Sequence, residues 1–219
     1  MKKVLVSILI LICCKSWAQE AFSIATDLSL LRNLNPKQKF TTIGQTVKAN
    51  FHVSPKDVAY VWLSYYGNGN FSFNETAMAD SSFTMPQQID FSVRSSFRYN
   101  QFSLGWKRYF RGNYEHEGGV NIYGYGGFGI LFGRVQNNYS QAVDTLLYSS
   151  KAPSAGTGKF TRLTLDAGLG GEYAIAPFLF IYTELRTWLP ASDYPSQYLR
   201  DNNNVPSVVA LNVGARVLF

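Results

Sequence analysis

Apolar and polar residues alternate with a period of two along most of this chain. The last fifteen residues show it most clearly: the apolar set is Val209, Leu211, Val213, Ala215, Val217 and Phe219, and Asn212, Gly214 and Arg216 lie between. Successive side chains of a β-strand point to opposite faces, so the pattern predicts a strand with one apolar face over residues 205–219. A soluble domain seldom ends this way, whereas a closed transmembrane β-barrel needs such strands.

Seven more segments alternate in the same manner. The predicted strands are Phe22–Arg32, Phe40–Val53, Val58–Tyr66, Ile89–Phe110, Gly119–Val135, Phe160–Ala174, Phe178–Leu189 and Val205–Phe219. The apolar parity of the fourth strand changes near Asn100, which predicts either a β-bulge there or a strand that rises above a membrane. The facing of the third and fifth strands stays open.

The connections between these strands alternate in length. They run to about 7, 22, 24 and 15 residues at one end and about 4, 8 and 3 at the other, as in outer-membrane barrels with short periplasmic turns and longer external loops. The sequence therefore predicts an all-β, eight-stranded antiparallel up-and-down transmembrane barrel with both termini in the periplasm. A turn near 99–101 plus a strand within 71–76 would instead give ten strands. The polar loops 67–88 and 136–159 are the expected binding regions, although their composition names no ligand.

Residues 1–18 are predicted to be a signal peptide, and residues 19–219 the barrel domain. Lys2 and Lys3 precede the apolar run Val4–Cys14, and Ser16-Trp17-Ala18 offers a cleavage site. The apolar run is too short for a spanning helix, although an uncleaved anchor is the alternative. Both cysteines lie in this segment, so the mature chain has no thiol for a disulfide, a nucleophile or a metal ligand.

Composition agrees with a membrane barrel. Aromatic residues make up 16% and charged residues 16% of the chain, against about 25% charged residues in soluble domains. The formal charge is +6, but three lysines lie in the signal peptide. The remaining excess is mild and no basic run accompanies it, so we expect no nucleic-acid partner.

Charged residues recur on the polar parity of the strands. A lipid-facing Arg near the membrane midplane costs about 2 to 4 kcal/mol, so we expect these residues to face the lumen and to pair there. The set is Asp27, Lys48, Lys107, Asp166, Glu172, Glu184, Arg186 and Arg216. They could line a path for ions, but side chains just fill an eight-stranded barrel. We therefore favour a structural, non-conducting plug.

Aromatic residues gather near the predicted periplasmic rim, as in the interfacial girdle of outer-membrane barrels; stacking of a ligand is the alternative. They are Phe22, Phe51, Trp106, Tyr109, Phe110, Tyr173, Phe178 and Phe219. We expect Tyr123 and Tyr125 to fill the lumen beside glycines. The glycine-rich run 124–129 precedes no helix, so it does not predict a nucleotide-binding loop.

Catalytic groups are sparse. The two histidines, His52 and His116, fall near the predicted periplasmic end and far from a second ligand, so they suggest neither a hydrolase triad nor a metal site. We expect no catalytic residue, no cofactor and no metal, hence a structural or surface-binding role rather than an enzyme. The alternatives are a lipid-modifying enzyme, a small pore or transporter, and a soluble lipocalin-type barrel.

Three segments resemble small bacterial outer-membrane proteins of the OmpA/OmpX type, and most of all the "outer membrane protein β-barrel domain" group of Bacteroidetes-like bacteria. They are Ser16-Trp17-Ala18-Gln19, the strand end Leu104-Gly105-Trp106-Lys107-Arg108-Tyr109-Phe110, and the terminal Arg216-Val217-Leu218-Phe219. The resemblance implies a monomer in the cell outer membrane of a Gram-negative bacterium, in contact with outer-membrane lipid. It also implies insertion by the barrel-assembly machinery, with Phe219, Val217 and Ala215 as the assembly signal.

Overall fold

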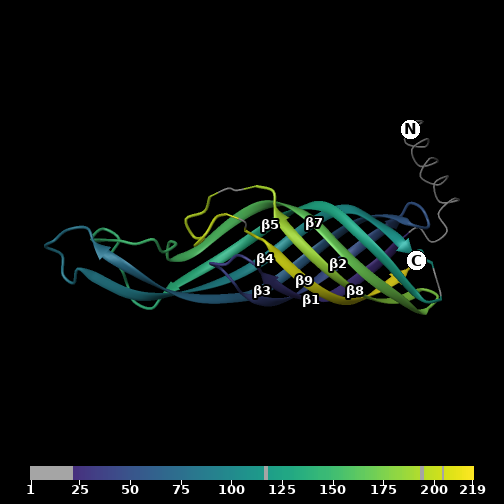
Figure 1. The fold of residues 1–219 in the computed structure, drawn as a ribbon, viewed down its shortest axis with the longest axis horizontal. Helices are drawn as coiled ribbons and strands as arrows, with labels where there is room; N and C mark the ends of the chain where they lie inside the picture. Colours follow the sequence, from purple (N-terminus) through teal and green to yellow (C-terminus); the bar gives the residue numbers. More distant parts are fainter. Residues whose placement is uncertain (1–21, 116–117, 193–194, 204) are drawn as a thin grey trace, which may run out of the picture.

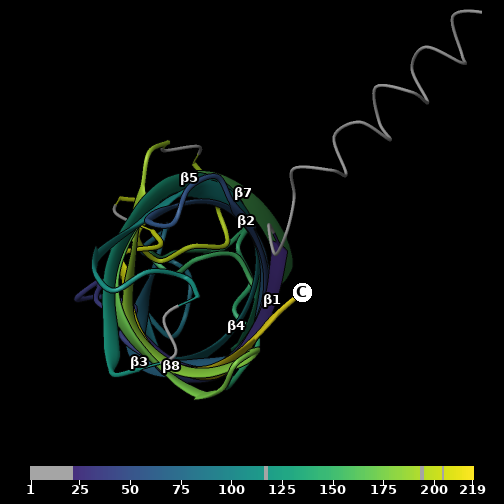
Figure 2. The same cartoon turned by 90° about the vertical axis from the view of Figure 1, so that its right-hand side faces the viewer.

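The computed structural model describes residues 22–115, 118–192, 195–203 and 205–219. The predicted signal peptide lies outside this part. The strands are β1 (Phe22–Asn33), β2 (Thr41–His52), β3 (Asp57–Ala79), β4 (Gln88–Arg111), β5 (Val120–Tyr139), β6 (Tyr148–Ser149), β7 (Gly156–Ala176), β8 (Leu179–Pro190) and β9 (Val208–Leu218). All except the two-residue β6 form one closed antiparallel ring, in which β1 pairs with both β2 and β9. The predicted eight-stranded barrel is confirmed, seen from the side in Figure 1 and from one end in Figure 2.

The two ends of the barrel differ. At one end short segments join the strands, and the first and last described residues meet there: the Phe219 amide donates to the Phe22 carbonyl at 2.9 Å. At the other end four strands continue past their neighbours, at the left of Figure 1. We call this part the extension; it comprises Gly69–Ala79, Gln88–Tyr99, Gly133–Tyr139 and Gly156–Arg162.

The extension corrects our prediction of long polar loops. Residues 67–79 and 88 continue the β3–β4 ladder out to the pair Met78 and Gln88. The two ends of the segment 136–159 belong to strands β5 and β7, which pair with each other. The segment 71–76 is therefore a strand, but it belongs to β3, and β4 runs without a turn through 99–101. Ten strands are excluded. The polar composition suggested loops because the outward face of these strands is rich in polar residues.

Of the two predicted causes of the parity change in β4, the structure excludes the bulge. Alternate residues of β4 face inward without interruption from Phe91 to Tyr109, so no bulge lies at Asn100. The register instead shifts in β3, between Tyr66 and Gly69, where Asn68 has a φ of 61°. Facing stays constant along β4, while the polarity of its two faces inverts where the strand continues past the barrel.

The outer surface of the barrel is apolar. Outward residues that are at least half exposed include Leu28, Ile43, Val47, Leu63, Phe128, Leu165, Leu169, Leu185, Leu211 and Val213. We call this surface the apolar band. A lipocalin-type barrel in water needs the opposite arrangement, with a polar exterior, so that alternative does not fit. Among the described residues, no helix is long and apolar enough to cross a membrane.

Candidate functional site

All eight charged residues predicted for the lumen are buried there, each at most 4% exposed. Each of them occupies one of the alternate strand positions that face inward, and the residues next to it in the strand face outward. The structure gathers seven of the eight into two carboxylate-centred clusters, and the eighth, Asp166, stands apart. Charged and aromatic side chains thus pack inside the ring of strands, which Figure 2 shows from one end.

The first cluster centres on Glu184 of β8. Lys48 Nζ lies 2.7 and 2.9 Å from its two carboxylate oxygens, Arg186 Nη2 lies 3.2 Å from Oε2, and the Tyr123 hydroxyl donates to Oε1 at 2.8 Å. Arg186 reaches Asp27 at 3.5 Å. Several donors on one carboxylate offset the large cost of removing these charges from water. The cluster joins β1, β2, β5 and β8 across the lumen.

The second cluster centres on Glu172 of β7 and lies nearer the end with short turns. Arg216 donates to both oxygens, at 2.7 and 3.2 Å, and the Tyr109 hydroxyl donates at 2.8 Å. Lys107 Nζ lies 3.5 Å from Oε2 and 3.5 Å from the ring centre of Tyr123. This cluster ties the C-terminal strand β9 to β4 and β7, so Arg216 links the last strand to the barrel interior.

Asp166 departs from the expectation that every lumen charge pairs with an opposite one. Within the described residues it forms no ion pair; its carboxylate accepts from Gln101 Nε2 at 2.7 Å, from Thr164 at 3.4 Å and from the Ser103 hydroxyl. We also missed a buried cation, Arg162, on the same inward parity of β7. Its guanidinium lies 5.5 Å from the Phe160 ring. The parity count that found Asp166 would have found it too.

Both mouths of the lumen are closed by side chains from connecting segments. At the extension end, Leu199 and Val205 of the β8–β9 connection pack into an apolar cluster with Phe97, Tyr99 and Trp188. At the other end Tyr114 of the β4–β5 turn enters the barrel. Sequence patterning missed these plugs because irregular segments carry no periodicity.

Of the two histidines, only His52 lies in the described part. Its ring stacks on Tyr114 with centroids 4.0 Å apart, and Nε2 lies 2.9 Å from the Ser23 hydroxyl. The described residues give His52 no hydrogen bond to a carboxylate, which a Ser-His-acid hydrolase needs. Nor do they hold a group of three or more His, Cys, Asp or Glu that could bind a metal. His116 lies outside the described residues.

The aromatic positions mostly face outward, with one correction. Phe51, Trp106, Phe110, Tyr173, Phe178 and Phe219 are exposed near the end with short turns. Tyr109 is instead 1% exposed, because it has the inward parity of β4 and its hydroxyl binds Glu172. Tyr123 and Tyr125 lie in the lumen, and a Cβ at Gly168 would overlap the Tyr125 ring. The glycines of β5 and β7 thus make room for rings.

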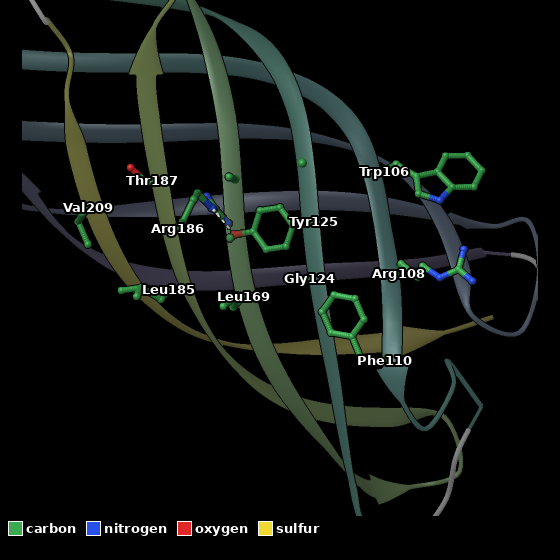
Figure 3. Close-up of a pocket in the computed structure, with 13 residues that line it drawn as sticks. Trp106, Arg108, Phe110, Gly124, Tyr125, Leu169, Leu185, Arg186, Thr187 and Val209 are labelled. Atoms are coloured by element: carbon green, nitrogen blue, oxygen red, sulfur yellow. Dashed lines mark hydrogen bonds between the residues drawn. The ribbon is translucent and has the colours of Figure 1, made fainter.

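The outer surface carries a shallow furrow of about 600 Å³, shown in Figure 3. Paired residues of adjacent strands form its axis: Trp106, Gly126, Ala167, Thr187 and Val209. Small residues sit at its centre, and large apolar ones, such as Phe110 and Leu185, border it. The furrow lies on the apolar band, and two residues that are buried in the lumen, Tyr125 and Arg186, also line it.

The extension reverses the polarity of the barrel. Apart from Met78 near the tip, its outward residues are polar: Asn70, Ser72, Asn74, Arg94, Arg98, Arg134, Gln136, Asn138, Thr157 and Lys159. Its inner face holds a separate apolar core of Ala77, Phe91, Val93 and Tyr148, with Phe73 and Tyr139 against it, and the buried polar residues Ser95, Asn137 and Arg162 lie nearer the barrel. Tyr148 comes from the β5–β7 connection, which folds over this inner face. The extension is therefore built like a soluble β-sheet.

Known proteins resemble this chain in structure but not in sequence. No family model matches the sequence, and no curated protein matches it. Among solved structures, Neisserial surface protein A (NspA) matches with a TM-score of 0.58 at 13% identity, covering 91% of this chain and 97% of that one. Ail, the attachment invasion locus protein of Yersinia pestis, solved with the heparin analogue sucrose octasulfate, gives 0.50 at 14%, covering 92% and 100%. The chain thus has the fold of small outer-membrane β-barrel proteins.

Proposed function

We propose that this protein is an integral barrel of a bacterial outer membrane, and that its filled lumen anchors a surface-exposed β-sheet used for binding. The observation that carries this proposal is the reversal of polarity between the apolar band and the extension. Strands with apolar residues outside suit lipid, and strands with apolar residues inside suit water. A chain that contains both in continuous strands fits a protein that crosses a membrane and projects from it.

We infer that the extension lies outside the cell and that both termini lie in the periplasm. The short segments 53–56 and 177–178 join strands at the end where Phe22 and Phe219 meet, and short turns are periplasmic in outer-membrane barrels. The extension then stands at the cell surface, where a long, rigid sheet can present polar side chains to a partner. We expect one copy of the chain to suffice, because the barrel is closed.

Epitope tags in intact cells test this arrangement. A tag inserted within 80–87, at the tip of the β3–β4 hairpin, should bind antibody without permeabilisation. A matched tag within 53–56 should bind only after the outer membrane is opened. Equal labelling of both sites in intact cells, or recovery of the mature protein in the soluble periplasm, would contradict the proposal.

The filled lumen supports a non-conducting barrel. Glu172 and Glu184 each bridge several strands through buried ion pairs, and plugs close both mouths. Ions would have to break these pairs to pass, at a cost of several kcal/mol. Purified protein in a planar lipid bilayer should show no discrete conductance steps; regular steps that scale with protein concentration would refute this.

A purely binding role also implies no catalysis. His52 lies at the end opposite the extension and contacts Tyr114 and Ser23, far from any outer-leaflet substrate in our orientation. Purified protein should neither deacylate nor transfer acyl chains on lipid A or phospholipid. Activity that disappears in His52→Ala or His116→Ala would establish the rival enzyme.

Assembly should depend on the terminal residue. Val217 and Ala215 continue the outward apolar face of β9 up to Phe219, which we propose the barrel-assembly machinery recognises. Deletion of Phe219 should lower outer-membrane levels of the protein. Arg216→Ala should insert normally but lose heat resistance, because Glu172 loses its closest partner. Equal levels and equal heat resistance in the two variants would contradict this division.

A further inference from the structure

Three cations stand side by side on the outward face of the extension. Arg98 of β4 pairs directly with Arg134 of β5, and Arg134 pairs directly with Lys159 of β7. We call these three residues the cationic row. All three side chains are exposed. Directly opposite residues on one face have Cβ atoms only about 4.5 to 5.5 Å apart, and like charges there destabilise the sheet.

No acidic side chain of the extension relieves this repulsion. Among the described outward residues of the extension, the one acid is Asp90, eight positions along β4 from Arg98. The neighbouring outward row consists of Ser96, Gln136 and Thr157. No ion pair in the described structure involves a member of the cationic row. An anion from outside the chain would therefore remove an unfavourable interaction as well as add favourable ones.

The position of the cationic row relative to the apolar band indicates which kind of anion it would bind. Arg134 follows the exposed Phe132 by two residues on the same face of β5, about 7 Å along the strand. Below Phe132 lies the apolar row of Phe102, Ile130 and Leu163. The lipid headgroup region is about 5 to 7 Å thick on each side of the hydrocarbon core. Tilted strands thus place the cationic row at headgroup level when Phe132 marks the edge of the hydrocarbon.

We propose that the cationic row binds the phosphate groups of anionic lipids in the outer leaflet. The inference rests on the membrane placement proposed above. Two guanidinium groups offer forked donors to phosphate oxygens, and the Lys159 ammonium adds a third charge. A phosphate held here leaves the acyl chains of the same lipid beside Phe132 and Leu163. This continuity with the apolar band favours a lipid over a soluble polyanion.

Lipid selectivity of the full mature protein tests the proposal. Wild-type protein is placed in phosphatidylcholine bilayers that contain a trace of spin-labelled phosphatidic acid, and its relative association constant is measured by electron spin resonance. The triple variant Arg98→Gln, Arg134→Gln, Lys159→Gln should lower that constant by about tenfold or more, since one basic residue near an anionic surface contributes roughly a factor of five. The control Lys37→Gln, Lys39→Gln, Lys151→Gln removes equal charge from exposed loops and should retain the selectivity.

A charge reversal separates binding from folding. Arg134→Glu places an acid between Arg98 and Lys159, so the extension should gain stability against proteolysis while the phosphatidic acid selectivity falls. Equal selectivity in wild type and the triple variant, equal losses in the triple variant and the control, or displacement of the lipid by equimolar inorganic phosphate would each overturn the lipid assignment. Insertion without selectivity refutes the row alone. Failure of the wild type to insert into bilayers refutes the proposed function and the row with it.

Discussion

The apolar band and the extension are two parts of the same strands, and β5 crosses both. In the band, Phe128 and Ile130 face outward, and Tyr123 and Tyr125 face the lumen beside buried charges. In the extension, Gln136 and Asn138 face outward and Val135 faces inward. The backbone pairing and the parity of facing do not change between them. Only the polarity assigned to each face changes.

The polarity of an alternating strand thus depends on what surrounds it, and polarity alone does not say which side chains face inward. In lipid the outward face must be apolar, because no water is present to solvate polar groups. In water the same face becomes polar and the inner face collapses into a core such as that around Phe91 and Val93. In the proposed membrane placement, the point of inversion between Phe132 and Arg134 marks the boundary between lipid and water.

The largest expected effect comes from opening a charge cluster of the barrel. Glu172→Ala should destabilise the protein by about 3 to 5 kcal/mol, because Arg216 and Lys107 would stay buried without their partner. Urea unfolding in lipid vesicles, followed by tryptophan fluorescence, measures the change. Asp90→Ala, which removes an exposed carboxylate of the extension, serves as the control and should change the free energy by less than about 0.5 kcal/mol. Similar losses in both variants would remove the distinction between the two regions.

The change of polarity between the apolar band and the extension can be tested with two substitutions on one strand. Phe128→Arg should cost about 2 to 4 kcal/mol, since its outward side chain lies within the apolar band. Gln136→Arg, on the same face of β5 but in the extension, should cost almost nothing. The same vesicle unfolding assay compares them, and an equal cost at the two positions would show that the outer face does not change environment.

The core of the extension should be separable from the barrel. Val93→Ala removes two buried methyl groups, which costs about 2 kcal/mol including the cavity. This loss should appear as faster hydrogen exchange and proteolysis of residues 69–79 and 88–99, with the urea midpoint of the barrel unchanged. Ser72→Ala, on the outward face of the same hairpin, is the control. A lowered barrel midpoint would show that the two regions fold as one unit.

The smallest effect concerns the turn between β2 and β3. The Trp106 indole donates to Asp57 at 3.1 Å, and Ser54 and Arg108 also contact its carboxylate; these interactions lower the pKa of Asp57. A lowered pKa in the folded state gives stability that is present above about pH 4 and lost as the pH falls through the folded value. The stability difference between wild type and Asp57→Asn should therefore shrink from pH 7 to pH 3. A constant difference would show that the charge of Asp57 does not matter.

Much of the barrel could be predicted from sequence because its rules are local. Period-two alternation located all eight long strands, and the cost of a charge in lipid turned Glu184 and Arg186 inward. The same local reading failed for the segment 67–79, whose polar residues Asn70, Ser72 and Asn74 suggested a loop. It failed again at Tyr109, which was assigned to the outer girdle by its position near the rim, although its parity is inward.

The alternation of apolar and polar residues was enough to locate the eight long strands and eight of the inward charges, because a side chain's face follows from its position along a strand. Only the tertiary structure decided which charges meet. Glu172 and Arg216 are far apart in sequence, and closure of the ring brings them within 2.7 Å. The register of the β4–β5 and β5–β7 ladders placed Arg98, Arg134 and Lys159 side by side, and register depends on contacts that no single strand contains.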